Sequence, residues 1–77
     1  MSEEQLRFFA LVDALTRHIE LAHANHQPVP ELCEEVLDRS LHYAASFGHF
    51  WYGAYEYEWS MQAMRAALLV LVPRVIH

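Results

Sequence analysis

The 77-residue chain contains no lysine, one cysteine and two glycines, and each scarcity argues against a class of function. Its five basic residues are all arginine and are outnumbered by ten acidic residues, which gives a formal net charge of −5. A chain without a basic stripe lacks the electrostatic footprint of a nucleic-acid-binding protein, and the anionic surface of a cytoplasmic membrane repels it. We therefore expect neither nucleic acid nor membrane as a partner.

A lone cysteine, Cys33, cannot form a disulfide within the chain, so the fold does not depend on oxidation. The longest unbroken apolar run, residues 66–73, is much shorter than the roughly 20 residues that a membrane-spanning helix requires. The N-terminus is acidic where a secretory signal would be basic. These features predict a soluble protein in the cytoplasm.

Catalytic signatures are also missing. Two glycines are too few for the common phosphate-binding loops, and no serine lies in a nucleophile-elbow context. Glu31, Glu34 and Glu35 surround Cys33 with negative charge, which disfavours a reactive thiolate. We assign no catalytic residue and expect a protein that is not an enzyme.

Six histidines raise the question of a metal site. Glu20 and His23 have the Glu-x-x-His spacing of di-iron carboxylate bundles, but those proteins need this unit twice, together with further inward-facing glutamates. No Cys/His pattern indicates zinc. We assign no metal and no cofactor. A helical bundle that binds a metal or small ligand through His18, His23, His26 or His42 is the alternative function.

Apolar residues at spacings of three and four predict an amphipathic helix over about residues 2–25. Ser2 and Gln5 form a capping-box pattern at its start, and Asp13 and Arg17 have the spacing of an ion pair on its wet face. The stripe consists of Phe8, Leu11, Val12, Leu15, Ile19 and Ala22.

Pro28 and Pro30 end this helix, because proline cannot continue it and biases its predecessor toward extended backbone. Pro30 fits the first position of a second helix, expected over about residues 31–47. Glu35 and Arg39 are again correctly spaced for an ion pair.

Beyond Phe47 two continuations fit the sequence. Gly48 can end the second helix, with a third helix over about residues 52–72 that stops at Pro73. Alternatively, one helix runs from Glu31 to Val72, about 60 Å long, and exposes aromatic stripes on opposite sides that only an oligomer could cover. We prefer the break, since it lets one monomer fold both stripes inward.

The expected fold is therefore all-α: a single domain over residues 1–77, built as a small bundle of two to three helices and completed by dimerisation. Hydrophobic residues make up 55% of the chain, more than a domain this small can cover by itself. We expect two copies of the chain to form a homodimer and to bury the remaining apolar surface between them. The predicted interface consists of Phe8, Leu11, Leu15, Leu68, Leu69 and Val72.

Eight of the ten Phe, Tyr and Trp residues lie between Tyr43 and Trp59. Phe47, Phe50 and Trp51 are expected to fill the core, while the following tyrosines and Trp59 alternate with glutamates. Tyr and Trp are enriched in interface hot spots. The predicted partner-binding face consists of Trp51, Tyr52, Tyr55, Glu56, Tyr57, Glu58 and Trp59.

These features favour a small non-enzymatic regulator or inhibitor, of the kind found among phage or mobile-element inhibitors, antitoxins and adaptors. It would dock its aromatic and acidic face on a larger protein that carries a basic and apolar groove.

Overall fold

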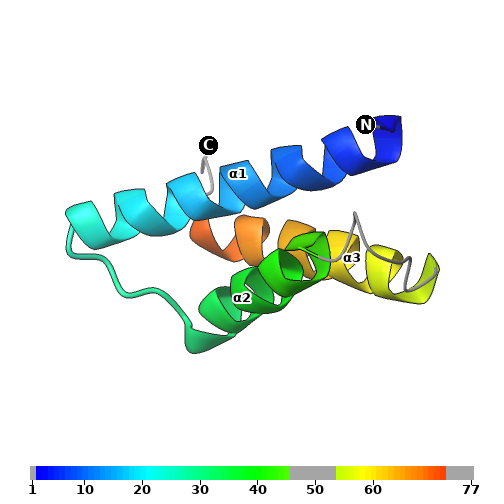
Figure 1. Ribbon diagram of the computed structural model, residues 1–77. Coiled ribbons are helices and arrows are strands. Elements are labelled where there is room, and N and C mark those ends of the chain that lie inside the picture. Colours follow the sequence, from blue (N-terminus) through cyan, green and yellow to red (C-terminus); the bar gives the residue numbers. More distant parts are fainter. Residues whose placement is uncertain (1, 46–53, 73–77) are drawn as a thin grey trace, which may run out of the picture.

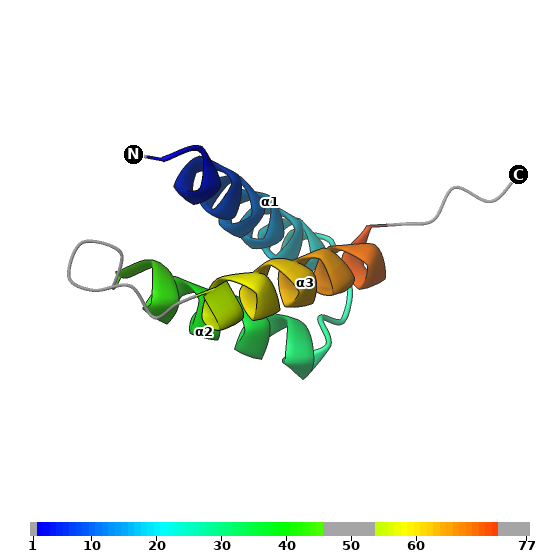
Figure 2. The same cartoon turned by 90° about the vertical axis from the view of Figure 1, so that its right-hand side faces the viewer.

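A computed structural model describes residues 2–45 and 54–72 of the chain. Within these residues it forms three α-helices: α1 (Glu3–Ala24), α2 (Glu31–Ala45) and α3 (Ala54–Leu71). They pack as a small all-α bundle in which every helix contacts the other two (Figure 1). Helices α1 and α3 begin at the same end of the bundle, and α2 runs in the opposite direction (Figure 2).

Helix α1 begins as the sequence predicts, with a capping box. The Gln5 backbone N–H donates to Ser2 Oγ (3.2 Å), and the Ser2 backbone N–H donates to Gln5 Oε1 (3.0 Å). The predicted ion pair between Arg17 and Asp13 is also present, at 2.9 Å. The start of α1 is thus determined by side chains within its own first turn.

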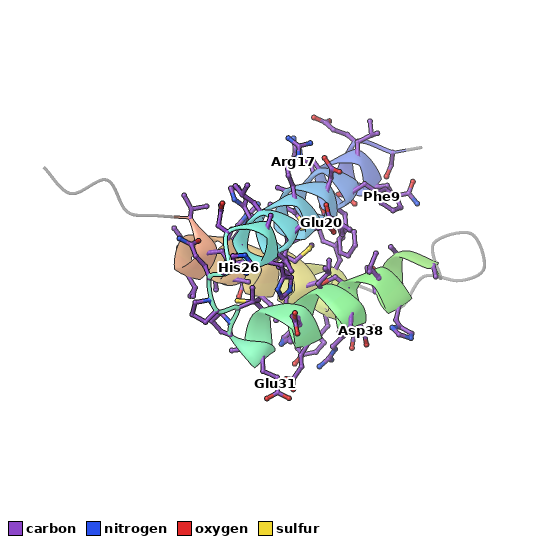
Figure 3. The ribbon with its side chains drawn as sticks, turned by 90° about the vertical axis from the view of Figure 1, so that its left-hand side faces the viewer. Phe9, Arg17, Glu20, His26, Glu31 and Asp38 are labelled. Carbon is purple, nitrogen blue, oxygen red and sulfur yellow. The ribbon has the colours of Figure 1, made fainter. Side chains whose placement is uncertain are left out.

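Helix α1 ends in a Schellman motif. The Gln27 N–H donates to the Ala22 carbonyl (2.8 Å), and the His26 N–H donates to the His23 carbonyl (3.1 Å). His26 takes the left-handed position of the motif, with φ of 56°. It lies in the turn that follows α1 (Figure 3).

Helix α2 begins at Glu31, where its predicted range of about residues 31–47 also begins, and Pro30 lies one residue before its first helical position. The Pro30 carbonyl accepts the N–H of Cys33 (2.9 Å). Proline fits there because neither its missing N–H nor its fixed φ disturbs the first turn.

The break between the second and third helices is confirmed, and the continuous helix from Glu31 to Val72 is wrong. Helix α2 ends at Ala45, and α3 begins at Ala54 and packs beside α2. Two shorter helices can pack against each other, whereas one long helix leaves both of its apolar stripes uncovered. Phe47, Gly48 and Phe50 lie outside the described residues.

The predicted stripe of α1 forms one wall of the core. Phe8, Val12, Leu15, Ile19 and Ala22 are buried, and Leu11 packs against them partly exposed. The other helices contribute mainly Cys33, Val36, Tyr43, Met61, Met64 and Ala67.

Phe8 joins the three helices through aromatic contacts. Its ring centroid lies 5.4 Å from that of Tyr43 on α2 in an edge-on arrangement, and 5.9 Å from that of Tyr57 on α3. Such geometries add to the free energy of simple area burial. Burial raises the pKa of Tyr43, and Glu56 and Tyr57 raise it further.

Two serines lie fully buried in the core, Ser40 on α2 and Ser60 on α3. Neither hydroxyl oxygen has a hydrogen-bond partner in the part of the chain that the structure describes. Their small side chains occupy little space in the core, at the expense of two desolvated hydroxyls.

None of α1, α2 and α3 combines the length and the hydropathy that crossing a lipid bilayer requires.

Candidate functional site

The predicted partner-binding face is divided by the packing of α3. Tyr55 is 74% exposed and Glu58 is exposed, whereas Glu56, Tyr57 and Trp59 are half-buried. Trp51 and Tyr52 lie outside the described residues. The structure therefore does not bring the five described residues together on one surface.

Tyr57 lies against α1. Its hydroxyl donates to the backbone carbonyl of Glu4 (3.1 Å), and its ring contacts Phe8. It thus joins the N-terminal ends of α1 and α3, while Tyr55 lies exposed.

Trp59 lies against α2. The guanidinium carbon of Arg39 is 4.0 Å from the centroid of the Trp59 ring, and Arg39 Nη2 is 3.6 Å from Glu56 Oε2. The predicted partner of Arg39, Glu35, is not the one that the structure shows. The Arg39 guanidinium stacks on the Trp59 ring of the neighbouring helix instead of pairing with Glu35, because the ring offers it a flat surface.

A groove of about 270 Å³ follows this contact along the boundary of α2 and α3. Pro30, Leu32, Cys33 and Val36 form its α2 side. Trp59, Val70 and three alanines, Ala63, Ala66 and Ala67, form its α3 side. The alanine side chain is small enough to leave room between the helices. The groove therefore results from the alanines at these three positions of α3.

The rim of the groove is strongly apolar and open to solvent. Leu32 is 68% exposed and Val70 is 64% exposed, and both line the groove together with Trp59. Tyr55 is one helical turn before Trp59, on the same side of α3. Large exposed side chains gathered around a hollow are typical of an interaction surface.

Cys33 lies at the base of the groove and is buried. Its Sγ approaches the backbone carbonyl of Ala67 at 3.9 Å, which is a weak thiol contact. Burial raises the pKa of the Cys33 thiol, and the charge of Glu34 raises it further. A buried thiol that is protonated packs as a small apolar side chain.

Acidic side chains dominate the outer surface of α2. Glu31 and Asp38 project from this helix on the side away from α1 (Figure 3), and Glu35 is also exposed. Arg39 is the one arginine of α2, which has no lysine, and its charge is partly compensated by Glu56. The helix that forms one side of the apolar groove thus has a predominantly acidic outer surface.

The groove residues Leu32, Ala63, Ala66 and Val70 were not among the predicted site residues. One signal could have indicated them: Tyr55, Trp59, Ala66 and Val70 follow helical spacing, so they share one side of α3. Because this stripe mixes alanines with large residues, it does not stand out as an interface from sequence.

A second hollow, of about 240 Å³, lies between α1 and α3. Arg7, Arg65, Glu58 and Gln62 line it together with Tyr57 and Met61. Arg7 is already paired with Glu3 at 2.9 Å. Charges of both signs share this rim, so it presents no clear preference for one type of ligand.

The residues of the predicted dimer interface are separated by the fold. Phe8 and Leu15 are fully buried within the chain and present no surface to a second copy. Leu11 and Leu68 are partly covered by the core. Leu69, 70% exposed, and Val72 remain accessible at the end of α3.

The histidines of the alternative function are also dispersed. His23 Nε2 lies 3.1 Å from Glu34 Oε1, so His23 contacts a glutamate of α2 and not Glu20 of its own helix. His42 Nδ1 lies 2.9 Å from the Asp38 carbonyl. Across residues 2–45 and 54–72, no group of three or more His, Cys, Asp or Glu side chains could hold a metal ion.

Comparisons of the chain with protein-family models, with curated proteins and with solved structures find no match.

Proposed function

We propose that this protein is a small non-enzymatic regulator that docks the α2–α3 side of its bundle on a larger protein. One observation carries the proposal: an apolar groove whose rim residues, Leu32 and Val70, remain mostly exposed. Placing such side chains in water is unfavourable, and covering them with a partner recovers about 25 cal/mol for each Å² buried.

The chemistry of the groove supports binding. Its lining consists of alkyl groups, one indole ring and a thiol whose pKa is raised. Such groups contribute contact area, whereas catalysis of proton transfer or nucleophilic attack needs titratable groups that ionise near neutral pH.

Contacts within the chain also hold the α2–α3 boundary in place. Arg39 holds the Trp59 ring from one side, and the core cluster supports the ring from another. Holding an anchor residue in place lowers the entropy lost on association. A preformed surface of this kind suits a protein that acts by covering its target or by holding it in one state.

The test is capture of proteins from a lysate of the source cells with the tagged chain as bait. A bait with both Tyr55→Ala and Trp59→Ala should lose the captured protein, whereas Leu6→Ala, an exposed leucine of α1, should retain it. Far-UV circular dichroism must show that all baits remain folded. Identical captures by all three baits would contradict the proposal.

Homodimerisation is the accompanying proposal, and it now rests on Leu69 and Val72 at the end of α3. Leu69→Asp places a charge at the exposed position and should halve the mass measured by light scattering. A Leu69→Asp variant that remains folded with an unchanged mass would count against the dimer.

A further inference from the structure

We infer that the α2–α3 groove receives the apolar face of an amphipathic helix whose flanking residues are Lys and Arg. This inference rests on the proposed function and deepens it, because it states the chemistry of the partner. Amphipathic helices commonly bind in this way, with anchor residues one or two turns apart.

The size of the groove favours side chains over a small molecule. Pockets for drug-sized ligands range from about 300 to 1,000 Å³, and they hold such ligands with a few precisely placed polar groups. This groove has about 270 Å³, and its named side chains are almost all hydrocarbon. It can take the side chains of one or two anchor residues, but it lacks the polar groups that orient a metabolite.

The length of the groove matches a helix. Trp59 and Val70 mark its two ends on α3, and eleven residues of helix correspond to about 16 Å. That distance covers about three turns, enough for anchors at positions i, i+4 and i+7 of a partner helix. Between the two ends, Ala63, Ala66 and Ala67 permit close approach of a second backbone.

The charges around the groove favour a basic partner. Glu31, Glu35 and Asp38 are exposed on α2. The one arginine of that helix, Arg39, lies near Glu56, and His42 lies near Asp38. Lys and Arg beside the anchor residues would face this acidic surface of α2 and accelerate association.

The same charges disfavour a second copy of this chain as the occupant. A symmetric pairing through the groove would bring the acidic residues of two α2 helices toward each other, between chains of net charge −5. Like charges in such positions oppose association. The proposed homodimer contact at Leu69 and Val72 is a separate one.

The test uses a synthetic peptide of about 18 residues, with leucines on one helical face and Lys and Arg on the other. A matched peptide carries Glu in place of every Lys and Arg. Binding of both to the full chain is measured by isothermal titration calorimetry. Wild type should bind the basic peptide.

Two variants locate the binding without changing the charge. Ala66→Leu fills the groove, and Ala10→Leu adds the same side chain at an exposed position of α1. We expect Ala66→Leu to weaken binding of the basic peptide about tenfold, and Ala10→Leu to leave it unchanged. The acidic peptide should also bind about tenfold more weakly to wild type.

Four results would overturn the inference: no binding of the basic peptide, equal binding by Ala66→Leu, equal binding of the acidic peptide, or a dimer that Ala66→Leu dissociates in sedimentation experiments. The outcome is separable from the proposed function. If Ala66→Leu still captures the cellular partner, docking on a larger protein stands and the groove inference fails. If no cellular partner is captured while the peptide binds in the groove, the groove inference stands and docking on a larger protein fails.

Discussion

The guanidinium of Arg39 stacks on the ring of Trp59, with its central carbon 4.0 Å from the ring centroid. The two residues come from α2 and α3, so this contact joins the two helices that border the groove. Glu56 lies on the same side, 3.6 Å from the guanidinium. The Trp59 side chain thus both joins α2 to α3 through Arg39 and lines the groove.

Replacing Arg39 by methionine should lower the free energy of unfolding by about 0.5–1.5 kcal/mol. Methionine keeps much of the apolar stem but removes the cation–π contact and the partly exposed ion pair. Urea denaturation followed by circular dichroism measures the difference. Arg17→Met, which removes only the pair with Asp13 on α1, is the control and should cost less. Equal losses would show that the stacking contributes nothing.

Replacing His26 by glycine should stabilise the protein by about 0.5–1 kcal/mol. His26 occupies the left-handed position of the Schellman motif, where a Cβ is unfavourable and glycine is not. The gain should appear as a higher melting temperature, of about 2–8 °C for a domain of this size. His26→Ala is the control. A variant that melts at or below wild type would mean that the His26 side chain makes a favourable contact of its own.

Ser40→Ala and Ser60→Ala should each leave stability unchanged or raise it by up to about 1 kcal/mol. A buried hydroxyl without a partner costs free energy of desolvation, and alanine removes it with little change of volume. Thermal unfolding of the two variants and of the double variant is the measurement. A loss of more than about 1 kcal/mol would show that a hydroxyl is hydrogen-bonded in solution.

Cys33 should react slowly with iodoacetamide in the folded protein. The pH at which its reaction rate rises should be higher for the folded protein than for the protein unfolded in urea. Burial and Glu34 raise the pKa of the folded thiol, so it stays protonated after the unfolded thiol has ionised. Any stability linked to this group is therefore complete below the unfolded pKa and is lost as pH rises through the folded pKa. Overlapping pH–rate profiles with and without urea would contradict the assignment.

The local features of the fold were predictable because each depends on residues near in sequence. The capping box of Ser2 and Gln5, the stripe from Phe8 to Ala22 and the proline break all follow from spacings within a few turns. The separation of α2 from α3 required only the argument that a long helix would leave both stripes uncovered.

The site was less predictable because it depends on how α3 is rotated against its neighbours. Spacing shows that Tyr57 and Trp59 point in different directions, but not that Tyr57 reaches Glu4 and Trp59 reaches Arg39. Leu32 and Val70 become one rim only when α2 and α3 pack together. Likewise, Phe8 and Leu15 have the composition of an interface, and the fold uses them as core.

The alanines of α3 have one more consequence. Alanine is the best helix former, and it is also the residue that keeps the groove open. Glycine would widen the hollow but weaken α3 by about 1 kcal/mol at each position, and a larger aliphatic residue would fill it. The alanines of this segment therefore keep the groove open without weakening α3. Natural selection could change the size of the groove here without a loss of helix stability.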